Sequence, residues 1–121
     1  MSKQNQVINV DRIQDRIYTI RGMQVMLDSD LSELYGVEAK RLNEQVKRNP
    51  DRFPLSFRFQ LTEGEYSSLR SQFATLKQER GKHRKYLPYV FTEQGVAMLS
   101  AVLKSETAVK VSIEIMQAFV V

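Results

Sequence analysis

Residues 40–48 hold the densest set of side chains in this sequence that could do chemistry. Lysine and arginine recur there, and the only acid between them is Glu44. Such cations neutralise phosphates and release the counterions that surround a nucleic-acid duplex. Amide side chains can read adenine, as arginine can read guanine. The candidate DNA contacts in this stretch are Lys40, Arg41, Asn43, Gln45, Lys47 and Arg48.

These side chains need a helix to bring them to one surface, and the surrounding sequence predicts two short helices. Asp30 followed by Glu33 is a capping-box-like pattern at the start of the first helix. Gly36 predicts its end, because glycine accepts the left-handed conformation of a sharp turn. We expect the second helix to run from about Glu38 to Asn49. The two would form a helix–turn–helix, whose second helix offers its outer face to a major groove.

A rotation of about 100° per residue divides the second helix into two faces. Ala39, Leu42 and Val46 fall on the side that would pack against the first helix, and the basic residues fall on the other. Asn43 and Gln45 flank the apolar stripe on opposite sides. The alternative is a solvated amphipathic helix, in which the intervening acid pairs with cations three or four residues away. The pattern by itself leaves both interpretations open.

A second basic cluster occupies residues 77–86, KQERGKHRKY, which we predict to be an exposed loop or hairpin tip. A basic loop beside a recognition helix could hold the DNA backbone or enter the minor groove. The alternative is a loop that only keeps the protein in solution. The candidate phosphate contacts outside the helix are Arg52, Arg80, Lys82, Arg84 and Lys85.

The sequence offers no set of residues for catalysis. His83 is the only histidine, and its basic neighbours indicate a source of pH-dependent charge. There is no cysteine, which excludes disulfides and thiolate metal sites. Neither a phosphate-binding loop nor a nucleophile elbow is present. We therefore predict a protein that is not an enzyme and has no metal, cofactor or small-molecule substrate.

The other elements predict a small α+β domain with a short hairpin and amphipathic C-terminal helices. Residues 17–20 and 23–27 are β-prone and flank a tight turn at Arg21-Gly22. Alternating polarity predicts a strand at residues 57–61. A further strand is expected at residues 86–91, where Pro88 indicates a sheet edge.

Capping residues predict three more helices. These begin after Thr62, Thr92 and Ser105, and the first two end near Phe73 and Leu103. We expect residues 1–12 to be a flexible lead-in and residues 13–121 to form a single domain.

The last helix is apolar on more than one side, because Val109 and Ile113 add a second stripe. This predicts either the N-terminal part of a longer protein or a helix that packs on another subunit. A homodimer through residues 105–121 is accordingly the alternative function, that of an interaction or oligomerisation module.

The composition is compatible with an acidic partner and with the cytoplasm. The chain has 121 residues, a net charge of +4 and an isoelectric point near 9.5. No apolar run approaches the length of a membrane span, and the first residues lack the apolar stretch of a signal peptide. We expect a cytoplasmic protein of a bacterial or phage-infected cell that has no membrane partner.

Several segments resemble the phage "ORF-six N-terminal" domain, from about residue 20 to the end. They are IRGMQVMLDSDLSELYGVEAKRLNEQVKRNPDRFP, FRFQLT, RSQFATLK, YLPYVFTEQGVAMLSAVL and IEIMQAFV. The LDSDLSELYGV and FTEQGVAMLS blocks occur in the family's order and spacing. This family is related to the KilA-N and Bro-N domains of phage antirepressors and large DNA viruses. The resemblance implies a compact α+β domain that binds double-stranded DNA in phage or prophage transcription regulators.

Overall fold

The centre of the fold is an antiparallel sheet to which both halves of the chain contribute. The computed structural model describes residues 10–72 and 86–119. Within these residues the sheet has four strands in the order β1-β2-β4-β3, and each neighbouring pair is antiparallel. The strands are β1 (Tyr18–Ile20), β2 (Met23–Leu27), β3 (Arg58–Gln60) and β4 (Tyr89–Phe91).

Two residues with positive φ angles connect β1 to β2. Arg21 has a φ of 56° and Gly22 a φ of 74°. Two successive residues of this kind form the tight turn whose twist matches that of a two-stranded hairpin. Ile20 pairs with Met23 on either side of the turn. The predicted hairpin is therefore confirmed.

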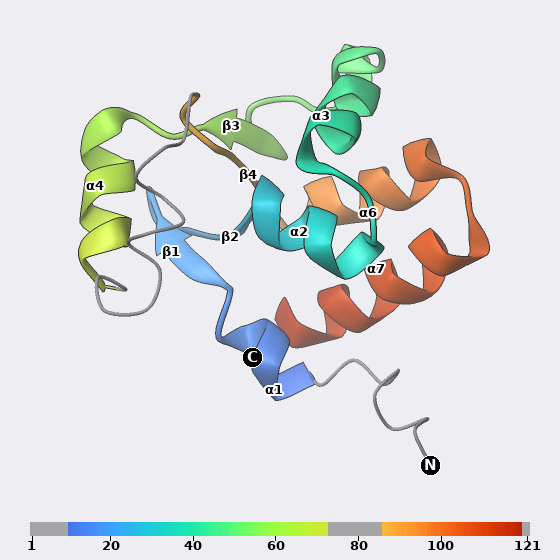
Figure 1. Ribbon diagram of the computed structural model, residues 1–121, viewed down its shortest axis with the longest axis horizontal. Helices are drawn as coiled ribbons and strands as arrows, with labels where there is room; N and C mark the ends of the chain where they lie inside the picture. The colour runs from blue at the N-terminus through green and yellow to red at the C-terminus, as the bar shows by residue number, and fades with distance from the viewer. Residues whose placement is uncertain (1–9, 73–85, 120–121) are drawn as a thin grey trace.

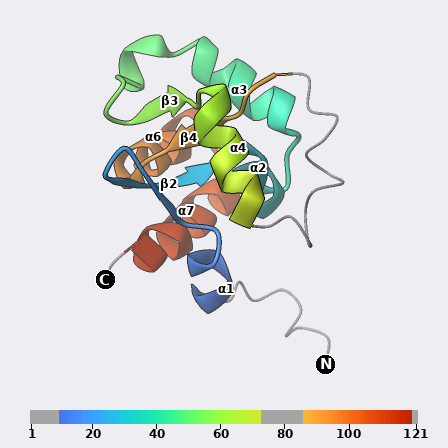
Figure 2. The same ribbon diagram turned by 90° about the vertical axis from the view of Figure 1, so that its left-hand side faces the viewer.

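Helices cover both faces of the sheet (Figure 1). Successive side chains of a strand point to opposite faces. Val25 and Val90 belong to a small core with Leu69 of α4 (Glu63–Gln72). Met26 and Phe91 belong to the main core on the other face. In Figure 2, which looks from the α4 side, this helix lies in front of the sheet, with α6 and α7 behind.

The main core lies between the sheet and the other helices. These are α1 (Val10–Gln14), α2 (Asp28–Tyr35), α3 (Ala39–Lys47), α6 (Glu93–Leu103) and α7 (Glu106–Phe119), with a short 3-10 helix η2 (Pro50–Arg52) after α3. The pairs α6 and α7, α2 and α3, and α1 and α7 are in contact. Helices and an antiparallel sheet together give the α+β fold that the sequence predicts.

Side-chain caps are present where the sequence predicts three of these helices to begin. Oγ1 of Thr62 accepts a hydrogen bond from the backbone N–H of Glu65 at 3.1 Å, and Oε1 of Glu65 accepts one from that of Thr62 at 2.8 Å. The hydroxyls of Thr92 and Ser105 each accept from the N–H three residues on, at 3.4 and 3.0 Å. These contacts satisfy donors that a helix start leaves open.

Asp30 and Pro88 do not mark the boundaries that the sequence predicts. Asp30 does not cap the first helix, because α2 already begins at Asp28 and its N-cap, Leu27, makes no side-chain cap. Asp30 instead lies 3.5 Å from Nη1 of Arg16. Pro88 does not mark a sheet edge, because it precedes β4, a strand paired on both sides. Its missing N–H therefore costs the sheet no hydrogen bond.

The segment predicted as a lead-in contains the start of α1, which begins at Val10. Residues 1–9 lie outside the described residues. Ile13 of α1 is buried in the main core, and the Gln14 amide donates to the carbonyl of Ala118 at 3.3 Å. Within the described residues, no helix combines the length and the apolarity needed to cross a bilayer.

Candidate nucleic-acid interface

A glycine turn joins α2 to α3 and sets the angle between them. Gly36 has a φ of 75°, and its N–H donates to the carbonyl of Glu33. The N–H of Val37 donates to the carbonyl of Ser32 at 3.0 Å. This pattern closes the C-terminus of α2 and redirects the chain. The helix pair expected from the sequence is therefore present, with α3 nine residues long.

Apolar side chains hold α3 on the rest of the domain. Leu42 and Val46 are buried in the main core, in the same cluster as Leu31 and Tyr35 of α2. Because they lie four residues apart on α3, they define its inner face. The opposite face is left to solvent.

The outward side of α3 is dominated by positive charge. We call four exposed cations the α3 basic face, and they are Lys40, Arg41 and Lys47 of α3 and its C-cap residue Arg48. The exposed acid Glu44 lies among them. Within residues 10–72 and 86–119, the salt bridges link Arg16 to Asp30 and Glu33, and Arg21 to Glu65. The pairing of Glu44 with neighbouring cations, which the solvated-helix interpretation requires, is not among them.

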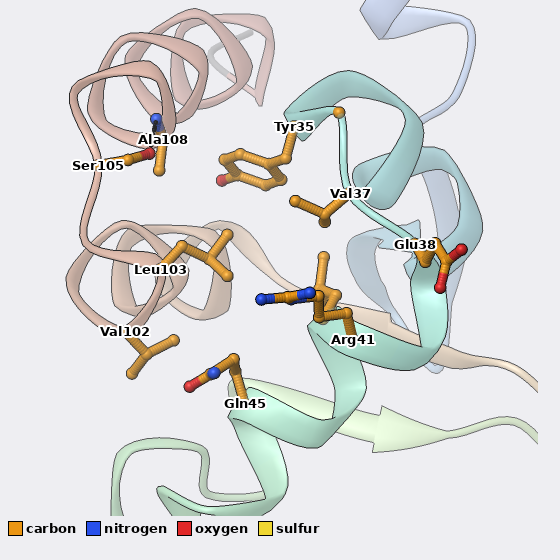
Figure 3. A pocket seen from close by; sticks show the side chains of 11 residues that line it. Tyr35, Val37, Glu38, Arg41, Gln45, Val102, Leu103, Ser105 and Ala108 are labelled. Carbon is orange, nitrogen blue, oxygen red and sulfur yellow. Dashed lines mark hydrogen bonds between the residues drawn. The ribbon is translucent and has the colours of Figure 1, made fainter.

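Arg41 lies at one side of this face, over a groove of about 610 Å³. The groove runs between α3, the α2–α3 turn and the α6–α7 corner. In Figure 3 the Arg41 side chain extends across its opening toward Leu103, and Gln45 lies on the same side of α3. Glu38 points away from the hollow. The Arg41 side chain therefore lies at a groove whose lining includes the apolar residues Leu42, Val102 and Leu103.

Asn43 is on the opposite flank of α3 and faces the protein. Its Nδ2 donates to Oδ2 of Asp28 at 2.9 Å. The same oxygen of Asp28 accepts the backbone N–H of Tyr89 at 3.2 Å. Asn43, a candidate DNA contact in the sequence, thus lies at the edge of the α3 basic face with its amide turned toward Asp28.

Of the phosphate contacts predicted outside α3, only Arg52 lies within the described part of the chain. It is exposed, and its Nη1 approaches the sulfur of Met98 at 3.9 Å. It follows α3 closely, at the end of η2. The other four, Arg80, Lys82, Arg84 and Lys85, lie outside the described residues.

Sequence reasoning missed an arginine that packs against Tyr89, the residue whose N–H binds Asp28. The guanidinium of Arg58, on β3, lies 3.7 Å from the centre of the Tyr89 ring. Burial lowers the pKa of Arg58, while the Tyr89 and Asp28 side chains act in the opposite direction. Arg58 has the polar position in the alternation Phe57-Arg58-Phe59, which predicts a solvent-facing residue. Only the tertiary packing of β3 beside β4 brings it over an aromatic ring.

Comparison with known proteins identifies the domain to which these elements belong. The search of curated proteins and the search of solved structures each returned no match to this chain. The model of the ORF6N domain family matches residues 15–102, a range that includes the hairpin, α2, α3 and the whole of α6 except its last residue. The match covers well over half of the 121 residues, and this chain therefore belongs to the ORF6N domain family.

Proposed function

We propose that this domain binds double-stranded DNA through the α3 basic face. The observation that carries the proposal is the set of four exposed cations on one side of α3, none of which forms a salt bridge within the described residues. A solvated surface helix gains from pairing its charges, whereas a phosphate-binding surface needs its cations available. The buried inner face of α3 means that only this outer side can meet a partner.

The dimensions of α3 suit a major groove. A helix with its side chains is about 10–12 Å in diameter, which matches a major groove about 12 Å wide, and nine residues extend about 13 Å along it. In this arrangement Lys40, Lys47 and Arg48 neutralise phosphates. Arg41 is the candidate for reading guanine, and Gln45 beside it for reading adenine.

Residues near α3 would extend the contact to the DNA backbone. Arg52 follows α3 and is exposed, so it can meet a phosphate at the C-terminal end of the helix. The basic cluster at residues 80–85 remains the second predicted phosphate contact. Contacts of this kind fix register and orientation, but they carry no sequence information themselves.

We further propose a regulatory role of the phage antirepressor type, exerted in the cytoplasm. Membership in the phage-type ORF6N family supports it. The domain would be a DNA-binding module of a transcription regulator, without catalytic activity of its own.

Fluorescence anisotropy of a labelled random-sequence duplex tests the proposal. We expect the wild-type protein to bind, with an association constant that falls steeply as salt rises. The double variant Lys47→Ala/Arg48→Ala should bind more weakly with a shallower salt dependence. Arg12→Ala, which removes an exposed cation from α1, should behave like the wild type. Absence of binding at the lowest salt concentration would refute the proposal.

A second candidate function is self-association through α7. Val109 and Ile113, four residues apart on this helix, are each 47% exposed. They are neighbours on one side of α7, where water contact of apolar surface is unfavourable. A dimer formed through this side would present two copies of α3 to two DNA half-sites, so the two functions are compatible.

A further inference from the structure

A buried carboxylate lies between α3 and the sheet. Asp28 is only 2% exposed, although its side chain ends in a polar carboxyl group. Its Oδ2 accepts hydrogen bonds from the Asn43 amide of α3 and from the first backbone N–H of β4. A single oxygen atom therefore connects the beginning of α2, the middle of α3 and the sheet. A buried carboxylate needs such donors, because it has lost its contact with water.

This contact constrains α3 in a way that its apolar contacts do not. Leu42 and Val46 attach the helix to the core, but burial of apolar surface has no preferred direction. A hydrogen bond weakens steeply when donor and acceptor are misaligned. The bond from Asn43 to Asp28 therefore restricts the rotation of α3 about its own axis more closely than the burial of Leu42 and Val46 does.

The position of Asn43 within α3 connects that rotation to the basic face. Lys40 lies three residues before Asn43, and Lys47 lies four residues after it. Residues with these spacings share one side of a helix. Any rotation that breaks the contact with Asp28 would also move the two lysines.

Asp28, which accepts the hydrogen bond from Asn43, is also bound to the sheet. Tyr89, whose N–H binds Asp28, pairs with Gln60 in the sheet. Its ring packs under the Arg58 guanidinium at 3.7 Å. Asp28 thus connects α3 to a strand paired on both sides, which makes a rigid reference for the helix.

The orientation of the amide also argues against a role in reading bases. The Asn43 Oδ1 atom is buried and has no hydrogen-bond partner within the described residues. A bidentate contact to adenine uses both amide atoms. Asn43 would have to leave Asp28 to make it, and a buried carboxylate would lose a donor.

We propose that Asp28 and Asn43 are positioning residues that set the rotation of α3 and thereby the direction of its basic face. The part of this proposal that concerns DNA rests on the function proposed above. Asn43 acts through the helix and does not touch the bases. The contact is a means of presenting the neighbouring lysines in one orientation.

Two variants and a matched control test the contact itself. Asn43→Ala removes the donor to Asp28. The double variant Asp28→Asn/Asn43→Asp reverses the polarity of the pair. In it, the amide nitrogen and oxygen introduced at position 28 must divide between them the two contacts that the single Oδ2 atom of Asp28 makes. The nitrogen would donate to the carboxylate introduced at position 43, and the oxygen would accept from the N–H of Tyr89. Gln94→Ala removes an exposed amide from α6 and serves as the control.

Amide hydrogen exchange without DNA gives the first measurement. In Asn43→Ala we expect the amides of α3 to exchange about tenfold faster relative to those of α6, which corresponds to about one lost hydrogen bond to a charged group. The double variant should restore slow exchange, and Gln94→Ala should match the wild type. Unchanged exchange in Asn43→Ala would overturn the proposal. If Asn43→Ala does not fold, a folded double variant supports it and an unfolded one overturns it.

Binding to a panel of duplexes gives the second measurement. Asn43→Ala should lower the affinity for all sequences by a similar factor, and the double variant should recover it. A loss confined to sequences with adenine at one position, without recovery, would identify a base contact and overturn the proposal. If the wild type binds no duplex, the proposed function fails, and the exchange measurement alone decides the role of Asp28 and Asn43.

Discussion

The guanidinium of Arg21 and the carboxylate of Glu65 form a two-point contact that connects the β1–β2 hairpin to α4. Nε of Arg21 lies 2.7 Å from one carboxylate oxygen, and Nη2 lies 3.0 Å from the other. The same Nη2 also donates to the carbonyl of Gln60 at 3.3 Å. Residue 21 belongs to the hairpin turn, so one side chain links the turn, β3 and the first turn of α4. Parallel hydrogen bonds of this kind are stronger than a simple surface ion pair.

This contact predicts a specific loss of stability in acid. The hydrogen bond from Arg21, followed by that from the Thr62 backbone, lowers the pKa of Glu65 from 4.5 to about 2. Because the folded pKa is depressed, the stabilisation is complete above the unfolded value and is lost as the pH falls from about 4.5 toward 2. Urea unfolding of wild type and Glu65→Gln should therefore differ most at neutral pH and converge in acid. A constant difference across that range would contradict the assignment.

Substitution by alanine should change the free energy of unfolding differently at three glycines. A Cβ at Gly95 would collide with the backbone carbonyl oxygen of Phe57, which also accepts the N–H of Thr92. Gly95→Ala should therefore destabilise the fold by about 3 kcal/mol, the upper range for overpacking. Gly36→Ala meets no atom but keeps a φ of 75°, so we expect a cost of about 1 kcal/mol.

Gly64 supplies the internal control for that series. It lies in α4 and a Cβ there would approach only the Thr62 hydroxyl, at 4.0 Å. Gly64→Ala should raise the free energy of unfolding by about 0.5–1 kcal/mol, because alanine has the higher helix propensity. Chemical denaturation gives all three values. A Gly95→Ala protein as stable as the wild type would contradict the close approach of α6 to residue 57.

Local sequence chemistry predicted the fold well where a few neighbouring residues decide the outcome. The turn at Arg21-Gly22, the stop at Gly36 and the reciprocal cap of Thr62 with Glu65 depend on conformational preferences and on hydrogen bonds within three residues. The predictions for Asp30 and Pro88 were wrong because contacts with distant segments determine the structure at these two residues. Asp30 lies beside Arg16, and strand β4 acquires partners from both β2 and β3.

The candidate site shows the same division between local and distant effects. Helical periodicity was sufficient to place Lys40 and Lys47 on an exposed face and Leu42 in the core. Periodicity also left Asn43 at the border, and only the position of Asp28, fifteen residues away, decides that its amide points inward. Arg58 was missed for the same reason, since the ring beneath it comes from a strand far along the chain. A periodic pattern thus predicts on which side of an element a residue lies, but not which side chains from distant segments it contacts.

Self-association through α7 predicts a change in mass from a single exposed substitution. Ile113→Lys places a charge beside Val109 on the exposed apolar side of α7. A dimer formed through this side would bury that charge without a partner, so the variant should be a monomer. Light scattering coupled to size-exclusion chromatography measures this. Thr107→Lys adds the same charge at another exposed position of α7 and should leave the mass unchanged. A wild-type protein with the mass of a monomer would remove the second candidate function.

The contribution of a single lysine to DNA binding can be measured from the dependence of the association constant on salt concentration. Lys47 is exposed on the α3 basic face and forms no salt bridge within the described residues, so its charge is available to a phosphate. Each phosphate neutralised contributes about 0.9 to the slope of log K against log salt concentration. Lys47→Ala should therefore reduce that slope by about one and weaken binding to all sequences alike.

The matched variant Arg12→Ala removes one positive charge from α1 and should keep the wild-type slope. A global change in net charge alters long-range attraction in both variants, whereas only a direct phosphate contact changes the number of counterions released. Equal slopes for the wild type and Lys47→Ala would remove Lys47 from the interface. Equal losses of slope in both variants would show that net charge, and not the geometry of α3, governs the binding.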